Sequence, residues 1–322
     1  MKIFGYFNAR KYKEATYIPI VNAMFAANKY YVTILFVHLL PRCASIANHT
    51  GHPGDYIFLV AGGQSIPEIQ NYTRYMVSLR SRTVTRYFGD NHYCAGIIIS
   101  PLWILTSAQC AVHASKIPRR PRSIIVVAGT ENRIVKSPTT SLIAVDRVIS
   151  NPNFTLYGSN DIALLRLKTK IQLNARTQIM PLPNTPPPYG TRCVVLGWGR
   201  IYYKGPLAAM VSHVELLLYI EDECKRSHPH FAAGDLCAGD NVNFDHDPCC
   251  GDSGGPLICN DKLVALVSWT LGCGQNKYPS LYTDIYSNLH WIRKVISGNG
   301  RVWGFYRTTV LLLANLLICI CL

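Results

Sequence analysis

The sequence predicts an all-β fold built from many short strands. Apolar stretches rich in β-branched residues alternate with clusters of glycine, proline, asparagine and serine through the central part of the chain. This pattern is typical of a β-sandwich or of β-barrels. The clearest strand candidates lie at residues 97–99, 124–127, 162–165, 194–196 and 263–267. Composition agrees with a compact chain, because 49% of the residues are hydrophobic and 16% are charged.

Three further segments complete the expected architecture. The proline-rich stretch at 181–188 is the natural linker between two halves. Leu289, Ile292 and Ile296 recur at helical spacing behind Ser287, which predicts a helix near the C-terminus with that serine as its cap. Residues 211–220 fit a helix or a strand, and periodicity does not separate the two.

The N-terminal part of the chain resembles a secretion signal. An apolar run at 31–40 follows Lys29 and precedes small residues at 43–45, which predicts a signal peptide with an N-terminal extension at 1–45. His38 interrupts the run, and a start at Met24 would give a more ordinary signal. A signal anchor is the alternative. A short propeptide-like segment is expected at 46–59.

The C-terminal 25 residues, 298–322, form a spacer and a hydrophobic tail. Small residues at 297–300, a spacer at 301–309 and an apolar run at 310–322 follow the order of a glycosylphosphatidylinositol signal. An uncleaved tail and a short membrane helix are the alternatives. Attachment to the membrane through the C-terminus is therefore expected, with the protein secreted or held on the outer cell surface.

The cysteine content and the glycosylation signals indicate the cellular compartment, and the charge limits the classes of partner. Twelve cysteines and three Asn-x-Ser/Thr sequons, at Asn48, Asn71 and Asn153, indicate an oxidising, glycosylating compartment. The net charge of +14 is spread along the chain, and no nucleic-acid motif accompanies it. We therefore expect no nucleic-acid partner and at most a bias toward acidic ones.

Two short motifs carry residues of catalytic type. Residues 251–256 read Gly-Asp-Ser-Gly-Gly-Pro, so the glycines let the backbone turn sharply, expose the Ser253 hydroxyl and aim the N–H groups of Gly251 and Ser253 at one point. An oxyanion hole needs that geometry. Asp161 stands immediately before a buried strand, where a carboxylate costs free energy unless donors surround it. Further upstream, Gln109 directly precedes Cys110.

Together these motifs strongly resemble the chymotrypsin and trypsin family of serine proteases, whose catalytic order is histidine, aspartate, serine. Residues 60–63 look like the family's mature N-terminus, 94–96 and Trp103 like the segment before its histidine, 197–199 like the start of its second barrel, and 267–269 like its substrate-binding strand. The resemblance covers about 240 residues. It implies two perpendicular six-stranded β-barrels with the active site between them. The domain would span 60–297, with barrels at about 60–183 and 184–285 and a helix at 286–297.

The resemblance also implies a disulfide pattern. The expected pairs are Cys94 with Cys110, Cys193 with Cys259, Cys224 with Cys237, and Cys249 with Cys273. Cys250 is left over, either as a shielded spare cysteine or as a link to another chain.

The chain departs from the family at the histidine, whose place is taken by Gln109. A carboxamide does not titrate near neutral pH, so it does not take and return the Ser253 proton. Gln109 can still donate to Asp161 and accept a hydrogen bond from Ser253. His113 is the nearest substitute base, but a loop histidine beyond the disulfide is expected to point elsewhere.

Activation departs from the family in a similar way. There, cleavage after lysine or arginine frees an amine, here that of Val60, which pairs with the aspartate beside the serine, here Asp252. Leu59 precedes Val60, and residues 43–59 contain no lysine or arginine.

The specificity pocket is altered as well. Its floor, Asp247, selects lysine or arginine in the family, whereas two usual wall glycines are Thr270 and Ser280 here. Side chains at these positions should narrow the pocket.

The sequence therefore predicts a secreted or surface-anchored serine protease homologue that has lost peptidase activity, although it retains Ser253 and Asp161. It would act by binding a protease, an inhibitor or a protease substrate. A weakly active endopeptidase with trypsin-like preference and a cell-surface recognition or adhesion protein are the alternatives. No metal and no cofactor are expected.

Overall fold

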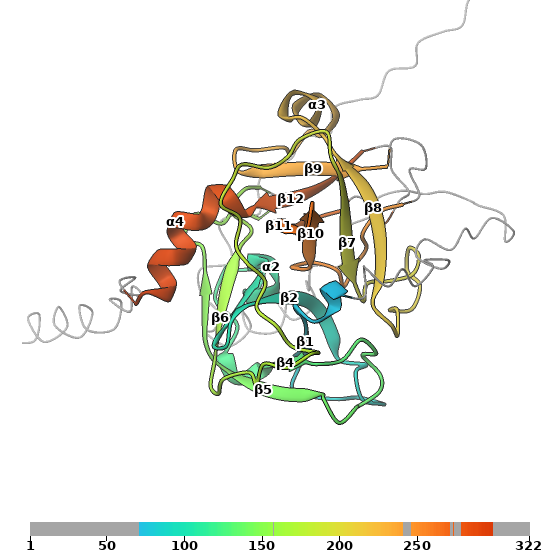
Figure 1. Cartoon of the computed structure of the whole chain (residues 1–322), viewed down its shortest axis with the longest axis vertical. Helices are drawn as coiled ribbons and strands as arrows, with labels where there is room; N and C mark the ends of the chain where they lie inside the picture. Colours follow the sequence, from blue (N-terminus) through green and yellow to red (C-terminus); the bar gives the residue numbers. More distant parts are fainter. Residues whose placement is uncertain (1–70, 157, 241–245, 271–272, 274–277, 299–322) are drawn as a thin grey trace, which may run out of the picture. The chain divides into compact units, whose positions relative to one another are not determined.

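A computed structural model describes residues 71–156, 158–240, 246–270, 273 and 278–298. Within these residues, twelve strands form two closed antiparallel β-barrels of six strands each, and one longer helix follows the last strand (Figure 1). The fold class predicted from the sequence is confirmed. The expected signal peptide, the propeptide-like segment and the hydrophobic tail lie outside the described residues.

The first barrel contains β1 (Met76–Ser81), β2 (His92–Ser100), β3 (Trp103–Thr106), β4 (Ile124–Ala128), β5 (Ser141–Ser150) and β6 (Ala163–Leu167). Their order around the barrel is β1-β2-β3-β6-β5-β4, and pairing of β1 with β4 closes it. Closure leaves no sheet edge unpaired. Side chains such as Val77, Leu79 and Ile98 fill the interior.

The second barrel contains β7 (Arg192–Gly197), β8 (Ser212–Leu218), β9 (Asp235–Gly239), β10 (Pro256–Cys259), β11 (Lys262–Trp269) and β12 (Ser280–Asp284). Its order is β10-β11-β12-β9-β8-β7, and it closes where β10 pairs with β7. The ambiguous segment at 211–220 contains strand β8. Its residues from Ser212 to Leu217 pair with β7, a long-range interaction that local periodicity does not reveal.

In the described part of the chain, three short helical segments lie between strands, and one longer helix follows the last strand. They are α2 (Ala108–Ala111), the 3₁₀ turn η1 (Pro121–Ser123), α3 (Glu221–Ser227) and α4 (Ile285–Ile296). The predicted Ser287 cap is wrong, because α4 begins two residues earlier. The Asp284 carboxylate at the end of β12 accepts the N–H groups of Tyr286 and Ser287 and so supplies the cap.

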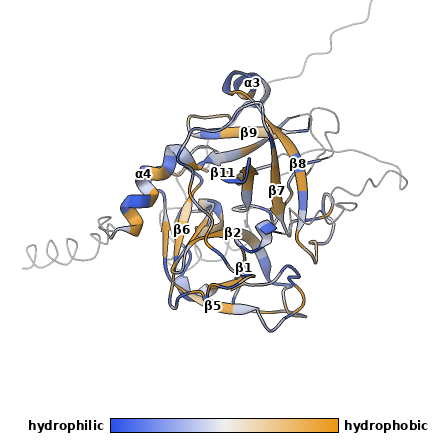
Figure 2. Cartoon of the chain, in the orientation of Figure 1, coloured by the Kyte–Doolittle hydropathy of each residue, from blue (hydrophilic) through white to orange (hydrophobic). Residues whose placement is uncertain are grey.

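A continuous apolar core joins the two barrels. It includes Met76 and Leu105 from the first barrel, Leu196 and Leu266 from the second, and Ile292 from α4. Figure 2 shows hydrophobic residues along the barrel strands and mainly hydrophilic ones on α3. The two barrels therefore hold each other in register, and the loops where they meet are positioned by buried side chains.

The four disulfides that the resemblance implied are confirmed: Cys94–Cys110, Cys193–Cys259, Cys224–Cys237 and Cys249–Cys273. Such bonds persist in oxidising compartments and fit an extracellular location. Among the described helices, none is long and apolar enough to cross a membrane.

Candidate active site

Ser253 lies in a turn that is hydrogen-bonded to both barrels. Its carbonyl oxygen accepts the Ala95 N–H of β2 at 2.9 Å, and Gly254 donates its N–H to the Val267 carbonyl of β11 at 2.8 Å. Gly254 has a φ of +77°, and a Cβ there would lie 2.6 Å from the Ala95 carbonyl oxygen. This turn therefore needs glycine after the serine. Ser253 itself is half-buried.

Asp161 is a fully buried carboxylate surrounded by neutral donors. One oxygen accepts the Gln109 backbone N–H at 2.8 Å. The other accepts the Gln109 Nε2 at 2.9 Å and the Ser268 hydroxyl at 2.7 Å. Burial raises the pKa of Asp161, and these hydrogen bonds oppose the rise. The structure thus brings Asp161 and Gln109 together from distant parts of the first barrel.

Gln109 uses both hydrogens of its amide nitrogen. Nε2 donates to Asp161 and, at 2.6 Å, to the carbonyl oxygen of Ser268 in β11. Because both partners only accept, the amide nitrogen, and not its oxygen, must face them. The expected hydrogen bond from Ser253 to Gln109 is not among those of the described residues. The side chain is instead a bridge between α2 and the second barrel.

The backbone of the turn at Ser253 includes a glycine with a left-handed conformation and two N–H groups that the sequence analysis assigned to an oxyanion hole. Gly251 has a φ of +108°, and a Cβ there would lie 2.8 Å from a methyl carbon of Leu207. Within the described part of the chain, no hydrogen bond uses the N–H of Gly251 or of Ser253. Two neighbouring N–H groups therefore remain available to a negatively charged or carbonyl oxygen.

Asp252, the residue before Ser253, is buried and bonded to backbone of the second half of the chain. Its carboxylate accepts the N–H groups of Gly199 at 2.6 Å and Cys249 at 2.9 Å. A Cβ on Gly197 or Gly199 would collide with this carboxylate, so the Gly-Trp-Gly segment makes room for it. Burial raises the pKa of Asp252 to about 6. Its expected partner, the Val60 amine, lies outside the described residues.

His92 is a site residue that the sequence analysis missed. Its Nε2 lies 3.1 Å from the Gly251 carbonyl oxygen, and its Nδ1 lies 2.8 Å from the Ser78 hydroxyl, which also accepts the Arg80 Nε at 2.9 Å. Nε2 must therefore donate, and Nδ1 must accept. Burial, together with the nearby charges of Arg133 and Arg80, lowers the pKa of His92 to about 3, although the hydrogen bond to Gly251 opposes the fall. A histidine inside an apolar strand, two residues before Cys94, was the available signal.

The expected specificity residues lie in the second barrel. Asp247 is nearly buried, and the Ser280 hydroxyl of β12 donates to its carboxylate. Tyr282 lies two residues further along the strand, and burial, with the charges of Asp247 and Asp252, raises the pKa of its hydroxyl well above the usual value. Thr270 is half-buried and directly follows β11. The Asp247 carboxylate is therefore already engaged by a hydroxyl.

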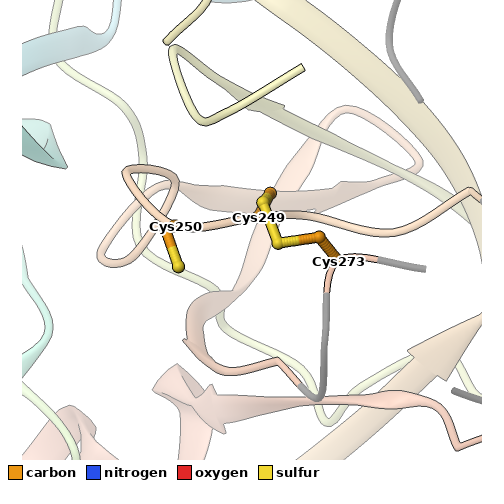
Figure 3. A group of neighbouring side chains, drawn as sticks. All are labelled: Cys249, Cys250 and Cys273. Carbon is orange, nitrogen blue, oxygen red and sulfur yellow. A yellow bond between two sulfur atoms is a disulfide. The ribbon is translucent and has the colours of Figure 1, made fainter. Parts of the chain in front are cut away.

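Three cysteine sulfurs gather beside the serine turn, with Sγ atoms within 4.8 Å of one another (Figure 3). Cys249 and Cys273 are disulfide-bonded to each other. The expectation that Cys250 is left over is wrong, because it too is disulfide-bonded, to a residue other than the eight in the four pairs above. Disulfide sulfurs are not thiolates, so this group does not ligate a metal as it stands.

The remaining predicted residues are the substitute base and the glycosylation sites, and those that the structure describes are exposed. His113 is exposed, and no hydrogen bond of the described residues joins its ring to Ser253 or Asp161. Asn71 and Asn153, the acceptors of two sequons, are exposed. Asn48 lies outside the described residues.

Comparison with known proteins gives one consistent result. The family model described as Trypsin matches residues 60–292. The chain is 32% identical to "Trypsin" of Xenopus laevis over 238 residues, which are 71% of this chain and 88% of that protein. It is 30% identical to "Putative trypsin-6" of Homo sapiens over 244 residues, 74% of this chain and 90% of the other. It is 30% identical to "Trypsin" of Sus scrofa over 233 residues, 71% and 93% respectively.

Proposed function

The chain belongs to the trypsin family of serine proteases, and we propose that it is a secreted or surface-anchored member that binds proteins without cleaving them. Proteins of this family interact with protein substrates and inhibitors. The observation that carries the proposal is the bonding of Gln109, whose amide nitrogen donates both its hydrogens to fixed acceptors.

Peptide hydrolysis by this family needs a base that takes the serine proton and returns it to the leaving amine. Gln109 does not titrate, and its amide nitrogen already donates to Asp161 and Ser268. His92 is no substitute, because burial holds its pKa near 3 and both ring nitrogens are engaged. Loss of the base in such triads lowers turnover by roughly a million-fold. A loss of turnover of this size would leave the chain able to bind a polypeptide without cleaving it at a useful rate.

Two further features support the same conclusion. Leu59 precedes the expected mature N-terminus at Val60, so trypsin-like activation after a basic residue has no substrate there. In the pocket, the Ser280 hydroxyl bonds to Asp247, the carboxylate that a basic side chain would otherwise meet. Thr270 adds a second side chain where the family usually has glycine.

The parts that remain suit recognition. Both barrels are closed, and the N–H groups of Gly251 and Ser253 are unused within the described residues. A peptide segment of a protease, an inhibitor or a protease substrate could therefore dock as a substrate does and stay uncleaved. Retention of Ser253 and Asp161 is the observation that favours the second candidate, a weakly active endopeptidase.

Restoration tests the proposal most informatively. The variant combining Leu59→Arg, Gln109→His, Thr270→Gly and Ser280→Gly, treated with an activating protease, should cleave peptides after arginine and lysine. The single variant Gln109→His should cleave little, because two other defects remain. Ser253→Ala in the combined background is the control. Full activity of the single variant would show that the pocket and the activation site work as they stand. The claim that both are defective would then be refuted.

Surface attachment is tested separately. The order of small residues, spacer and apolar run after residue 296 supports a lipid anchor, and the exposed Asn71 and Asn153 support glycosylation. Phosphatidylinositol-specific phospholipase should release the protein from cells. If release fails while truncation after Gly300 gives normal secretion, a membrane helix or a retained tail explains the attachment better.

A further inference from the structure

Positive charge is concentrated in the first half of the first barrel. Residues 71–130 contain eight lysines and arginines and a single acidic residue, Asp90. Six of the eight lie on two loops, one joining β1 to β2 at 82–91 and one joining α2 to β4 at 112–123. We call these six the basic face: Arg82, Arg86, Lys116, Arg119, Arg120 and Arg122.

The two loops lie side by side. Ser81 pairs with Ile124 at the adjoining ends of β1 and β4, and the Arg82 N–H donates to the Ser123 carbonyl oxygen at 3.1 Å. Arg82 and Arg122 are therefore neighbours. Arg119 is held from the other side, with its guanidinium 5.1 Å from the centroid of the Tyr93 ring in β2.

The charges of the basic face are not neutralised within the described residues. None of the six side chains forms an ion pair there. The Asp90 carboxylate is occupied by the Thr85 hydroxyl and by backbone N–H groups of its own turn. The Arg119 Nε is buried, and no described residue gives it a hydrogen-bond partner. Like charges held this close repel one another, and a bound anion would relieve the repulsion.

Exposed apolar side chains are interleaved with these charges. Val84 is 48% exposed, Tyr87 52% and Ile117 61%, and all three belong to the same two loops. Arginine and tyrosine are among the residues that protein interfaces favour. The combination fits a polypeptide that offers both acidic and apolar side chains.

We propose that the basic face docks an acidic polypeptide segment that also carries apolar residues. It lies next to the candidate active site, because the Arg119 N–H donates at 2.8 Å to the Ala111 carbonyl oxygen of α2, the helix that carries Gln109. A partner docked there could reach Gln109 and Ser253 with a neighbouring segment. The choice of a polypeptide as the partner rests on the proposed function. The basic face itself consists of residues outside the serine turn.

Fluorescence anisotropy with the purified secreted domain tests the proposal. The probes are a short synthetic peptide alternating aspartate or glutamate with phenylalanine and leucine, a peptide of equal charge with serine in place of the apolar residues, and a heparin oligosaccharide. The mixed peptide should bind most tightly, and its affinity should fall as ionic strength rises from about 0.01 M to about 0.15 M, because screening shortens from about 30 Å to about 8 Å.

Two charge-reversed variants locate the binding. Changing Arg82, Arg120 and Arg122 to glutamate should weaken the mixed peptide at least about tenfold. The matched control changes three exposed lysines elsewhere, Lys168, Lys170 and Lys204, to glutamate and should change affinity by less than about twofold. The double variant Tyr87→Ser with Ile117→Ser should abolish the preference for the mixed peptide over the serine peptide. It leaves the charge unchanged.

Several outcomes would overturn the proposal. Equal losses in the two charge-reversed variants would show binding to net charge alone. Tighter binding of heparin than of the mixed peptide would assign the face to a glycan. Self-association at low ionic strength, lost when Glu221, Asp222 and Glu223 of α3 are neutralised, would assign it to a second copy. Peptidase activity of the unmodified protein would contradict the proposed function without affecting this binding.

Discussion

The substitution Gln109→Ala tests whether the Gln109 side chain stabilises the fold by bridging the two barrels. The substitution removes the Nε2 hydrogen bonds to Asp161 at 2.9 Å and to the Ser268 carbonyl at 2.6 Å, and it leaves the backbone bond to Asp161 in place. A hydrogen bond to a charged group contributes about 1.5–3 kcal/mol and one between neutral groups about 0.5–1.5 kcal/mol. We therefore expect the free energy of unfolding to fall by about 2–4 kcal/mol. For a domain of this size, Tm should fall by about 5–15 °C.

Thermal and urea unfolding of the secreted domain, with its disulfides intact, measure the effect. Gln172→Ala is the matched control, because Gln172 is exposed and, among the described residues, its backbone carbonyl accepts hydrogen bonds whereas its side chain forms none. Gln109→Glu should destabilise the protein at neutral pH by placing a second carboxylate beside Asp161, and acidification should relieve part of that loss. If Gln109→Ala were as stable as the control, Gln109 would not bridge the barrels and the hydrogen bonds inferred for it would be wrong.

Three other predictions address the surrounding groups. Because the pKa of His92 is about 3 when folded, unfolding takes up a proton below about pH 6.5, and the protein should lose up to about 5 kcal/mol of stability as the pH falls from 6.5 to 3. His92→Gln keeps a donor and an acceptor and should remove that pH dependence; an unchanged curve would contradict the buried neutral imidazole. Ser280→Gly should strengthen binding of a small aromatic amidine about tenfold by freeing the Asp247 carboxylate, and equal affinity in both proteins would argue against the hydroxyl bond. Non-reducing peptide mapping should recover the four disulfides and a fifth peptide joined to Cys250, whereas a bond from Cys250 to Cys273 would break the assignment.

Local sequence was informative where local chemistry decides the structure. The apolar strands predicted an all-β fold, and the glycines around Ser253 predicted a sharp turn that exposes its hydroxyl. The two six-stranded barrels and the four disulfides were implied by the resemblance of the motifs to the chymotrypsin and trypsin family. The helix cap was misjudged because Asp284 belongs to a strand and a cap at once. Strand β8 was ambiguous because its partner lies outside its own segment.

Contacts between distant residues could not be predicted in the same way. Gln109 and Ser268 are 159 positions apart, and nothing in either motif says that the Gln109 amide reaches a carbonyl of the second barrel. His92 holds the Gly251 carbonyl across the same sequence separation. Such contacts depend on how the barrels pack, which composition and spacing do not encode directly. The sequence thus pointed to Ser253, Asp161 and Gln109 and to the bond between the last two, but it revealed neither His92 nor the bond from Gln109 to Ser268.

Labelling with a fluorophosphonate tests the central claim most directly, because the reagent reports whether the Ser253 hydroxyl is an activated nucleophile. Purified secreted domain should show no labelling above that of Ser253→Ala, and it should not cleave peptides containing arginine or lysine. Robust labelling of the unmodified protein that disappears in Ser253→Ala would contradict the account and establish an active serine peptidase.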